Sequence, residues 1–107
     1  MAVSGSFCKE GFLLQSERNI RRHFRFYGRV QGVGFRYRAY YAARNYGITG
    51  YVKNLYDGSV EMEVQAPEEC IDKMILSIEK GNFIQIDNLE VSDLPVKEDE
   101  REFRVVD

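Results

Sequence analysis

The hydrophobic periodicity of this chain changes abruptly across one glycine-rich stretch, residues 28–36 (Gly-Arg-Val-Gln-Gly-Val-Gly-Phe-Arg). Before the stretch, Phe24 and Phe26 alternate with polar or amphipathic side chains, which predicts a β-strand with one buried face. After it, the spacing becomes helical and ends at a glycine suited to a helix C-terminus: Phe35, Ala39, Ala42, Tyr46 and then Gly47. The sequence therefore predicts a strand, a glycine-rich loop and a helix in immediate succession.

The middle of the chain continues this mixture of strands and helices. Residues 48–54 predict a second strand, and the alternation over residues 59–66 predicts a third. Residues 55–58 (Leu-Tyr-Asp-Gly) between them are typical of a tight hairpin turn. Pro67 suits the first position of a second helix, which we expect to close at Lys80 and Gly81. Its buried stripe is predicted to comprise Ile71, Met74, Ile75 and Ile78.

The remaining residues predict two more strands. Over residues 84–91 the apolar positions fall out of step, so we expect a β-bulge near Asp87 and Asn88. An acidic loop, residues 97–102, then leads to a short strand over residues 103–106. This order predicts an α+β protein with a ferredoxin-like βαββαβ sandwich. Two helices would lie on one face of an antiparallel sheet that gains a short extra C-terminal strand.

The length of 107 residues allows one domain with a single hydrophobic core. Residues 1–19 contain several serines and glycines and only one short apolar cluster, so we expect them to form a mobile N-terminal arm. Residues 20–107 would then form the folded domain.

Positive charge is concentrated around the glycine-rich stretch. The net charge is only -2, but residues 18–56 contain nine Lys or Arg residues and no acidic residue, so all 17 acidic residues lie elsewhere. Glycine-rich backbone can turn its N–H groups inward, and the start of a helix adds partial positive charge at the same place. These features predict a binding site for an anion, most simply a phosphate.

The cysteines and the hydropathy of the sequence indicate the cellular compartment and whether a metal site is expected. Cys8 and Cys70 fit no metal-ligand spacing, and we expect both to be free thiols in a reducing compartment. No apolar run approaches the roughly 20 residues that a membrane span requires. We therefore predict a cytoplasmic protein without a metal site.

Arg36 is the first candidate functional residue. At the start of a helix, its guanidinium can hold two phosphate oxygens while the loop amides hold others. The alternative is a solvated arginine in the first helical turn, where the helix dipole would disfavour its charge.

Asn54 is the second candidate, at the end of the second predicted strand. Its neutral amide can orient a water molecule beside a phosphate without the repulsion that an aspartate would create. Alternatively, Asn54 is only a turn residue.

Two motifs make a family resemblance specific. The residues Gly28-x-Val30-Gln31-Gly32-Val33-x-Phe35-Arg36 are followed by Gly50-Tyr51-Val52-Lys53-Asn54-x-x-x-Gly58-x-Val60. This pair resembles the paired signature of the acylphosphatases, and the resemblance covers about residues 21–107. One departure is Ala66, where the family usually has a glycine after the third strand.

The resemblance implies a site and a reaction. Arg36 would bind the phosphate and Asn54 would position the attacking water. The phosphate-binding loop would comprise Gln31, Gly32, Val33, Gly34, Phe35 and Arg36. The activity would be metal-independent hydrolysis of the carboxyl–phosphate bond of small acyl phosphates, which yields a carboxylate and inorganic phosphate and needs no cofactor. We expect a monomer that binds neither nucleic acid nor a membrane.

Two other functions remain open on the sequence alone. The same fold supports RNA recognition, and the basic half contains Phe35, Tyr37 and Tyr40. However, the stacking aromatics of RNA-binding modules usually lie on central strands, whereas these residues open a helix. A non-catalytic phosphate-binding accessory domain is the second alternative.

Several other residues are given structural interpretations. The single histidine, His23, is predicted to be a surface residue rather than a catalytic base. The four tyrosines of the first helix, Tyr37, Tyr40, Tyr41 and Tyr46, are predicted to serve helix packing and the surface rather than a binding site.

Overall fold

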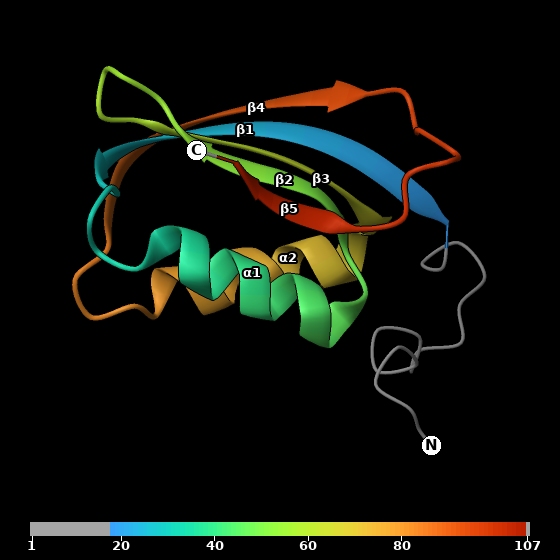
Figure 1. Ribbon diagram of the computed structural model, residues 1–107, viewed down its shortest axis with the longest axis horizontal. Coiled ribbons are helices and arrows are strands. Elements are labelled where there is room, and N and C mark those ends of the chain that lie inside the picture. Colours follow the sequence, from blue (N-terminus) through green and yellow to red (C-terminus); the bar gives the residue numbers. More distant parts are fainter. Residues whose placement is uncertain (1–17, 107) are drawn as a thin grey trace.

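The computed structural model describes residues 18–106, which form two layers: a five-stranded sheet and two helices packed on one of its faces (Figure 1). The elements are β1 (Asn19–Arg29), α1 (Phe35–Tyr46), β2 (Thr49–Asn54), β3 (Val60–Pro67), α2 (Glu68–Glu79), β4 (Gln85–Leu94) and β5 (Phe103–Val106). This order confirms the predicted ferredoxin-like sandwich and its extra C-terminal strand. Most of the predicted N-terminal arm, residues 1–17, lies outside the described residues, and Asn19 already belongs to β1.

The four strands β4, β1, β3 and β2 form an antiparallel sheet, as predicted, and the extra strand β5 makes the whole sheet mixed. The strand order is β4-β1-β3-β2-β5; the first three neighbouring pairs are antiparallel, and β5 is parallel to β2. The loop after β4 carries the chain from one edge of the sheet to the other and reverses its direction. Since β2 also runs opposite to β4, the returning strand β5 must run parallel to β2.

The predicted bulge is present, and it explains the first glycine of the glycine-rich stretch. Tyr27 pairs with Asn88 and Gly28 with Ile86, so Asp87 is the extra residue on β4. Gly28 has φ 129°, and a Cβ there would collide with the carbonyl oxygen of Gln85. Gly28 is thus required by strand pairing. Beyond the bulge, β4 continues to Leu94 rather than ending at residue 91.

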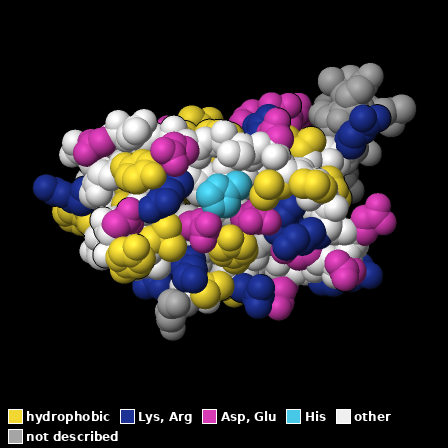
Figure 2. All heavy atoms as spheres, turned by 90° about the horizontal axis from the view of Figure 1, so that it is seen from above, with side chains coloured by type: hydrophobic (Ala, Val, Ile, Leu, Met, Phe, Trp, Pro, Cys, Tyr) yellow, Lys and Arg dark blue, Asp and Glu magenta, His cyan; other side chains and the backbone are white. Residues whose placement is uncertain are grey.

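The face of the sheet that the helices leave uncovered carries interspersed acidic and basic side chains (Figure 2). Arg21 is only 1% exposed there, with its Nε 2.6 Å from Glu63 and its Nη1 2.7 Å from Glu100. Burial opposes the charge of Arg21, but the two carboxylates outweigh burial and raise its pKa above the ordinary value. On the same face, the partly exposed His23 lies 2.7 Å from Glu61, as expected of a surface residue.

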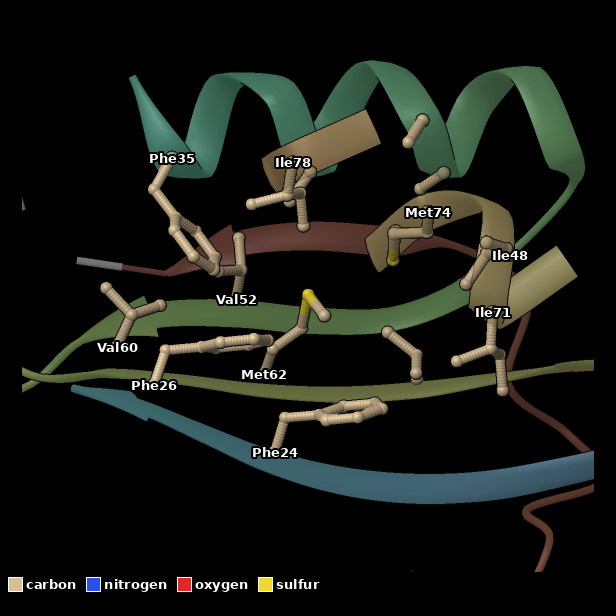
Figure 3. Close-up of a cluster of buried hydrophobic side chains, with 14 of the residues drawn as sticks. Phe24, Phe26, Phe35, Ile48, Val52, Val60, Met62, Ile71, Met74 and Ile78 are labelled. Atoms are coloured by element: carbon tan, nitrogen blue, oxygen red, sulfur yellow. The ribbon is translucent and has the colours of Figure 1, made fainter. Parts of the chain in front are cut away.

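The hydrophobic core lies between the helices and the sheet (Figure 3). Phe26 of β1 and Met62 of β3 point toward the helices, and Met74 of α2 is fully buried in the same core. Phe35, the first residue of α1, packs on Phe26 with ring centroids 4.8 Å apart. Burying such a ring stabilises the fold by about 1.5–3 kcal/mol, so the start of α1 is anchored to the sheet.

Two predictions about α2 need correction. Pro67 ends β3 and immediately precedes the helix, rather than occupying its first position. Cys70 is fully buried and disulfide-bonded, so the prediction of a free thiol is wrong for this residue; Cys8 lies outside the described residues. Whether a cysteine is oxidised depends on which sulfur atoms approach in the tertiary structure, and Cys70 does not support a reducing compartment. No helix within residues 18–106 is long and apolar enough to cross a membrane.

Candidate active site

The loop between β1 and α1 is held at both ends and shaped by two glycines. Val30 and Phe35 are each 1% exposed and anchor the loop in the core. Gly32 and Gly34 have φ 73° and 87°, in the left-handed region that glycine adopts without strain. A Cβ at either position would meet no atom within 4 Å, so the requirement comes from backbone conformation.

The N-terminus of α1 is suited to an anion. Gly34 is the N-cap residue and has no side chain that can accept hydrogen bonds from the first N–H groups of the helix. The first turn contains no acidic residue and carries Arg36 instead. A bound anion could accept hydrogen bonds from these N–H groups and interact favourably with the helix dipole.

A pocket of about 420 Å³ opens beside this helix N-terminus. It joins the glycine-rich loop and α1 to the ends of β2 and β5, and it is lined by Val30, Gly32, Gly34, Phe35, Arg36, Tyr37, Tyr40, Asn54 and Val105. The two predicted functional residues, Arg36 and Asn54, therefore line one pocket. Arg36 is the only charged residue among these lining residues, so the side chains that form the pocket favour a negative ligand.

Asn54 lines this pocket and also carries an unsatisfied hydrogen-bond acceptor. It is the last residue of β2 and pairs with Val60 of β3. Its Oδ1 atom is buried and has no hydrogen-bond partner among the described residues. A buried acceptor without a partner costs about 1–3 kcal/mol, which a donor from a water molecule or ligand would recover.

The side chain of Gln31 makes its contacts outside the pocket. Its Nε2 donates hydrogen bonds to the carbonyl oxygens of Leu55 at 2.6 Å and Ser59 at 2.9 Å. The side chain thus ties the loop to the turn that follows Asn54. Among the six residues of the predicted phosphate-binding loop, Gln31 and Val33 do not line the pocket.

A carboxylate fixes the same turn from its other side. Asp57 Oδ1 accepts hydrogen bonds from the Ser59 hydroxyl at 2.6 Å and the Ser59 N–H at 3.0 Å. Arg25 contributes Nη2, 2.6 Å from Asp57 Oδ2. The hydrogen bonds from Ser59, assisted by Arg25, lower the pKa of Asp57 to about 2. The backbone leading out of Asn54 is therefore held by two polar side chains, Gln31 and Asp57.

The acylphosphatase family model matches residues 22–105, which includes both motifs and both candidate functional residues. The chain belongs to the acylphosphatase family. It is 45% identical over 84 residues to an acylphosphatase of Caldanaerobacter subterraneus subsp. tengcongensis, a match that covers 78% of this chain and 93% of the relative. An acylphosphatase of Clostridium acetobutylicum is 42% identical over 80 residues, covering 74% and 88% of the two chains.

Solved structures agree with this family assignment. The crystal structure of acylphosphatase from Bacillus subtilis superposes with a TM-score of 0.74 and 31% identity, and covers 81% of this chain and 98% of that chain. Full-length HypF in its phosphate- and nucleotide-bound form gives a TM-score of 0.76 and 29% identity, but the match spans only 12% of HypF. The family resemblance seen in the sequence motifs is thus confirmed, and this acylphosphatase is a hydrolase.

The sequence did not reveal the whole lining of this acylphosphatase pocket. Tyr37 and Tyr40 were expected to serve packing and the surface only, yet both line the pocket beside Arg36. For Tyr40 the available signal was its spacing, because a residue four positions after Arg36 lies on the same helix face. Val105 had no such signal, since it reaches the pocket only through the parallel pairing of β5 with β2.

Proposed function

We propose that this acylphosphatase hydrolyses the carboxyl–phosphate bond of small acyl phosphates without a metal ion or cofactor. The observation that carries the proposal is the pocket that joins Arg36, the start of α1 and the unsatisfied amide oxygen of Asn54. These groups suit the three tasks of the reaction: holding a phosphoryl group, orienting a water molecule and stabilising charge.

The phosphoryl group would bind at the start of α1. Arg36 would hold two of its oxygens through its fork of donors, and the N–H groups of the loop and of the first helical turn would hold the others. Such preorganised donors stabilise the charge that spreads over the phosphoryl oxygens during transfer. Gln31 would act indirectly, because its hydrogen bonds fix the distance between the loop and the turn after Asn54.

The attacking water would donate a hydrogen bond to Asn54 Oδ1. Water attacks phosphorus, the bond between phosphorus and the bridging oxygen breaks, and the acyl group leaves as a carboxylate. The proton of the water passes to a phosphoryl oxygen of the substrate. Because a carboxylate is a good leaving group, correct positioning supplies most of the catalysis and a strong general base is not required.

The uncovered face of the sheet does not favour nucleic-acid binding. Glu61 and Glu63 of the central strand β3 alternate with the buried Met62 and therefore lie on that face, and Glu63 is paired with the buried Arg21. Phe35, one of the aromatic residues considered for stacking, is 1% exposed within the core. We therefore expect no nucleic-acid partner. Arg36 and Asn54, the two side chains that the proposed mechanism needs, line one pocket within a single chain, and we therefore also propose that a monomer is active.

The second candidate function is a phosphate-binding domain without turnover, because the chain is also similar to a small part of HypF, a protein whose structure was solved in a phosphate- and nucleotide-bound form. Release of inorganic phosphate from benzoyl phosphate separates the two functions. We expect the parent protein to release phosphate equally well with and without a chelator, and Arg36→Ala to be close to inactive. Activity that required a metal ion would contradict the mechanism, and phosphate binding without turnover would favour the alternative.

A further inference from the structure

Part of the pocket lining is apolar, and binding of a phosphate does not explain it. The polar part of the lining consists of Arg36, Asn54 and the backbone of Gly32 and Gly34. The remaining lining residues are aromatic or aliphatic: Val30, Phe35, Tyr37, Tyr40 and Val105. A volume of about 420 Å³ lies within the range of pockets that bind whole small molecules, so a phosphate would fill only part of it.

The two tyrosines stand directly beside the proposed phosphate site. Tyr40 follows Arg36 by four positions on α1 and Tyr37 by three, so Tyr40 neighbours both of these side chains on the helix surface. Tyr37 is 65% exposed although it borders the pocket. An exposed ring at this position is available to a ligand that extends out of the phosphate site.

The rings are also braced from the side. Tyr41, which does not line the pocket, meets Tyr37 and Tyr40 in edge-to-face contacts with centroid distances of 4.7 and 5.4 Å. The hydroxyl groups of Tyr37 and Tyr41 are 3.4 Å apart. The Arg44 guanidinium lies 5.9 Å from the Tyr40 ring centroid. These contacts restrict the ring orientations before any ligand binds, which lowers the entropic cost of binding.

We propose that Tyr37, Tyr40 and Val105 form a subsite for the acyl group, and that this subsite favours aromatic acyl phosphates over acetyl phosphate. The inference rests on the proposed function. With the phosphoryl group at the start of α1, the acyl group must extend away from it. The apolar lining residues border the same pocket and can contact this acyl group. Aromatic rings gain from offset or edge-to-face contacts with other rings in addition to the area that they bury. An acetyl group is too small to make these contacts.

The test compares benzoyl phosphate with acetyl phosphate in Tyr37→Ala, Tyr40→Ala and the double variant. We expect kcat/KM for benzoyl phosphate to fall about fivefold for each ring removed, and kcat/KM for acetyl phosphate to change less than about twofold. Tyr37→Phe and Tyr40→Phe keep the rings and should retain the preference for benzoyl phosphate. Phe83→Ala removes another exposed ring, 70% exposed and outside the pocket lining, and should behave like the parent.

Equal losses on both substrates, or no loss on either, would overturn the inference. Binding of benzylphosphonate and methylphosphonate, measured by calorimetry, separates this failure from a failure of the proposed function. If the parent bound benzylphosphonate more tightly, and the double variant lost that preference, the subsite would stand even without turnover. If the parent hydrolysed acyl phosphates but bound both phosphonates equally, hydrolysis would stand and the subsite would be wrong.

Discussion

The two helices have the same length, 12 residues, and opposite chemistry at their N-termini. The first turn of α2 carries Glu68 and Glu69, whose negative charges complement the positive end of the helix dipole. The first turn of α1 contains no acidic residue, carries Arg36 and is preceded by Gly34, which has no capping side chain. The chain therefore supplies the negative charge for α2, whereas at α1 the proposed function assigns the negative charge to a ligand.

The difference indicates which helix N-terminus serves stability and which serves function. An acidic side chain in a first turn contributes typically about 0.3–1 kcal/mol, and a capping side chain about 1 kcal/mol. Neither helix has a capping side chain, so the helices differ in the acidic contribution: it is absent at α1, where a positive side chain stands in its place. A local departure from helix rules is expected where a site must bind a ligand. Five predictions test this interpretation of the two helices.

The largest effect is expected at Arg36. Arg36→Ala should lower kcat/KM for benzoyl phosphate by about 10²–10³-fold, because one preorganised charge-stabilising group is lost from the α1 site. It should also weaken inhibition by inorganic phosphate. Steady-state kinetics measure both effects, and Arg101→Ala in the exposed acidic loop serves as a control that should change neither. Near-parental activity of Arg36→Ala would remove the functional distinction between the helices.

The next effect concerns Asn54, which faces the α1 site from β2. Asn54→Ala should lower kcat about 10²-fold, because the water is no longer positioned, and should leave inhibition by inorganic phosphate within about twofold of the parent. Asn54→Asp has nearly the same shape but adds a negative charge, so it should weaken phosphate inhibition as well. Hydrolysis of benzoyl phosphate by Asn54→Ala at the parental rate would refute the water-positioning role.

The element order and the two candidate residues could be predicted because local signals carry them. Periodicity and glycines mark the helices, strands and bulge, and the motifs place Arg36 and Asn54. Features that depend on contacts between distant segments could not be predicted in this way. The parallel pairing of β5 brings Val105 to the pocket, and the hydrogen bonds of Gln31 depend on a turn 24 positions later. The disulfide state of Cys70 is a further feature of tertiary structure.

Substitutions of the two glycines that flank α1 should distinguish a loss of stability from a loss of activity. Gly34 before the helix and Gly47 after it have φ 87° and 69°, and neither position would crowd a Cβ. Gly34→Ala and Gly47→Ala should each lower the free energy of unfolding by about 1–2 kcal/mol, since both force alanine into the left-handed region. Only Gly34→Ala should also lower kcat/KM, because it redirects the N–H groups at the phosphate site. Urea unfolding and kinetics on the same samples would show whether the two effects separate.

A smaller effect is expected at the N-terminus of α2. Glu69→Gln should lower the free energy of unfolding by about 0.3–1 kcal/mol at low ionic strength, because the helix dipole loses a complementary charge. Added salt should reduce the difference from the parent. The kcat/KM for benzoyl phosphate should not change, since this helix start is not part of the pocket. A loss of activity without a loss of stability would contradict the role assigned to α2.

The smallest effect is expected at the turn after Asn54. There the Asp57 carboxylate accepts a hydrogen bond from the Ser59 N–H, much as an acidic side chain complements a helix N-terminus. Because hydrogen bonds from Ser59 lower the folded-state pKa of Asp57 from 3.8 to about 2, its charge stabilises the fold fully above pH 3.8, and this contribution is lost as the pH falls toward 2. Asp57→Asn should therefore be less stable than the parent near neutral pH, and the difference should shrink between pH 4 and pH 2. Urea unfolding at several pH values measures this convergence. A difference that stayed constant with pH would show that hydrogen-bond geometry, rather than the charge of Asp57, holds the turn after Asn54.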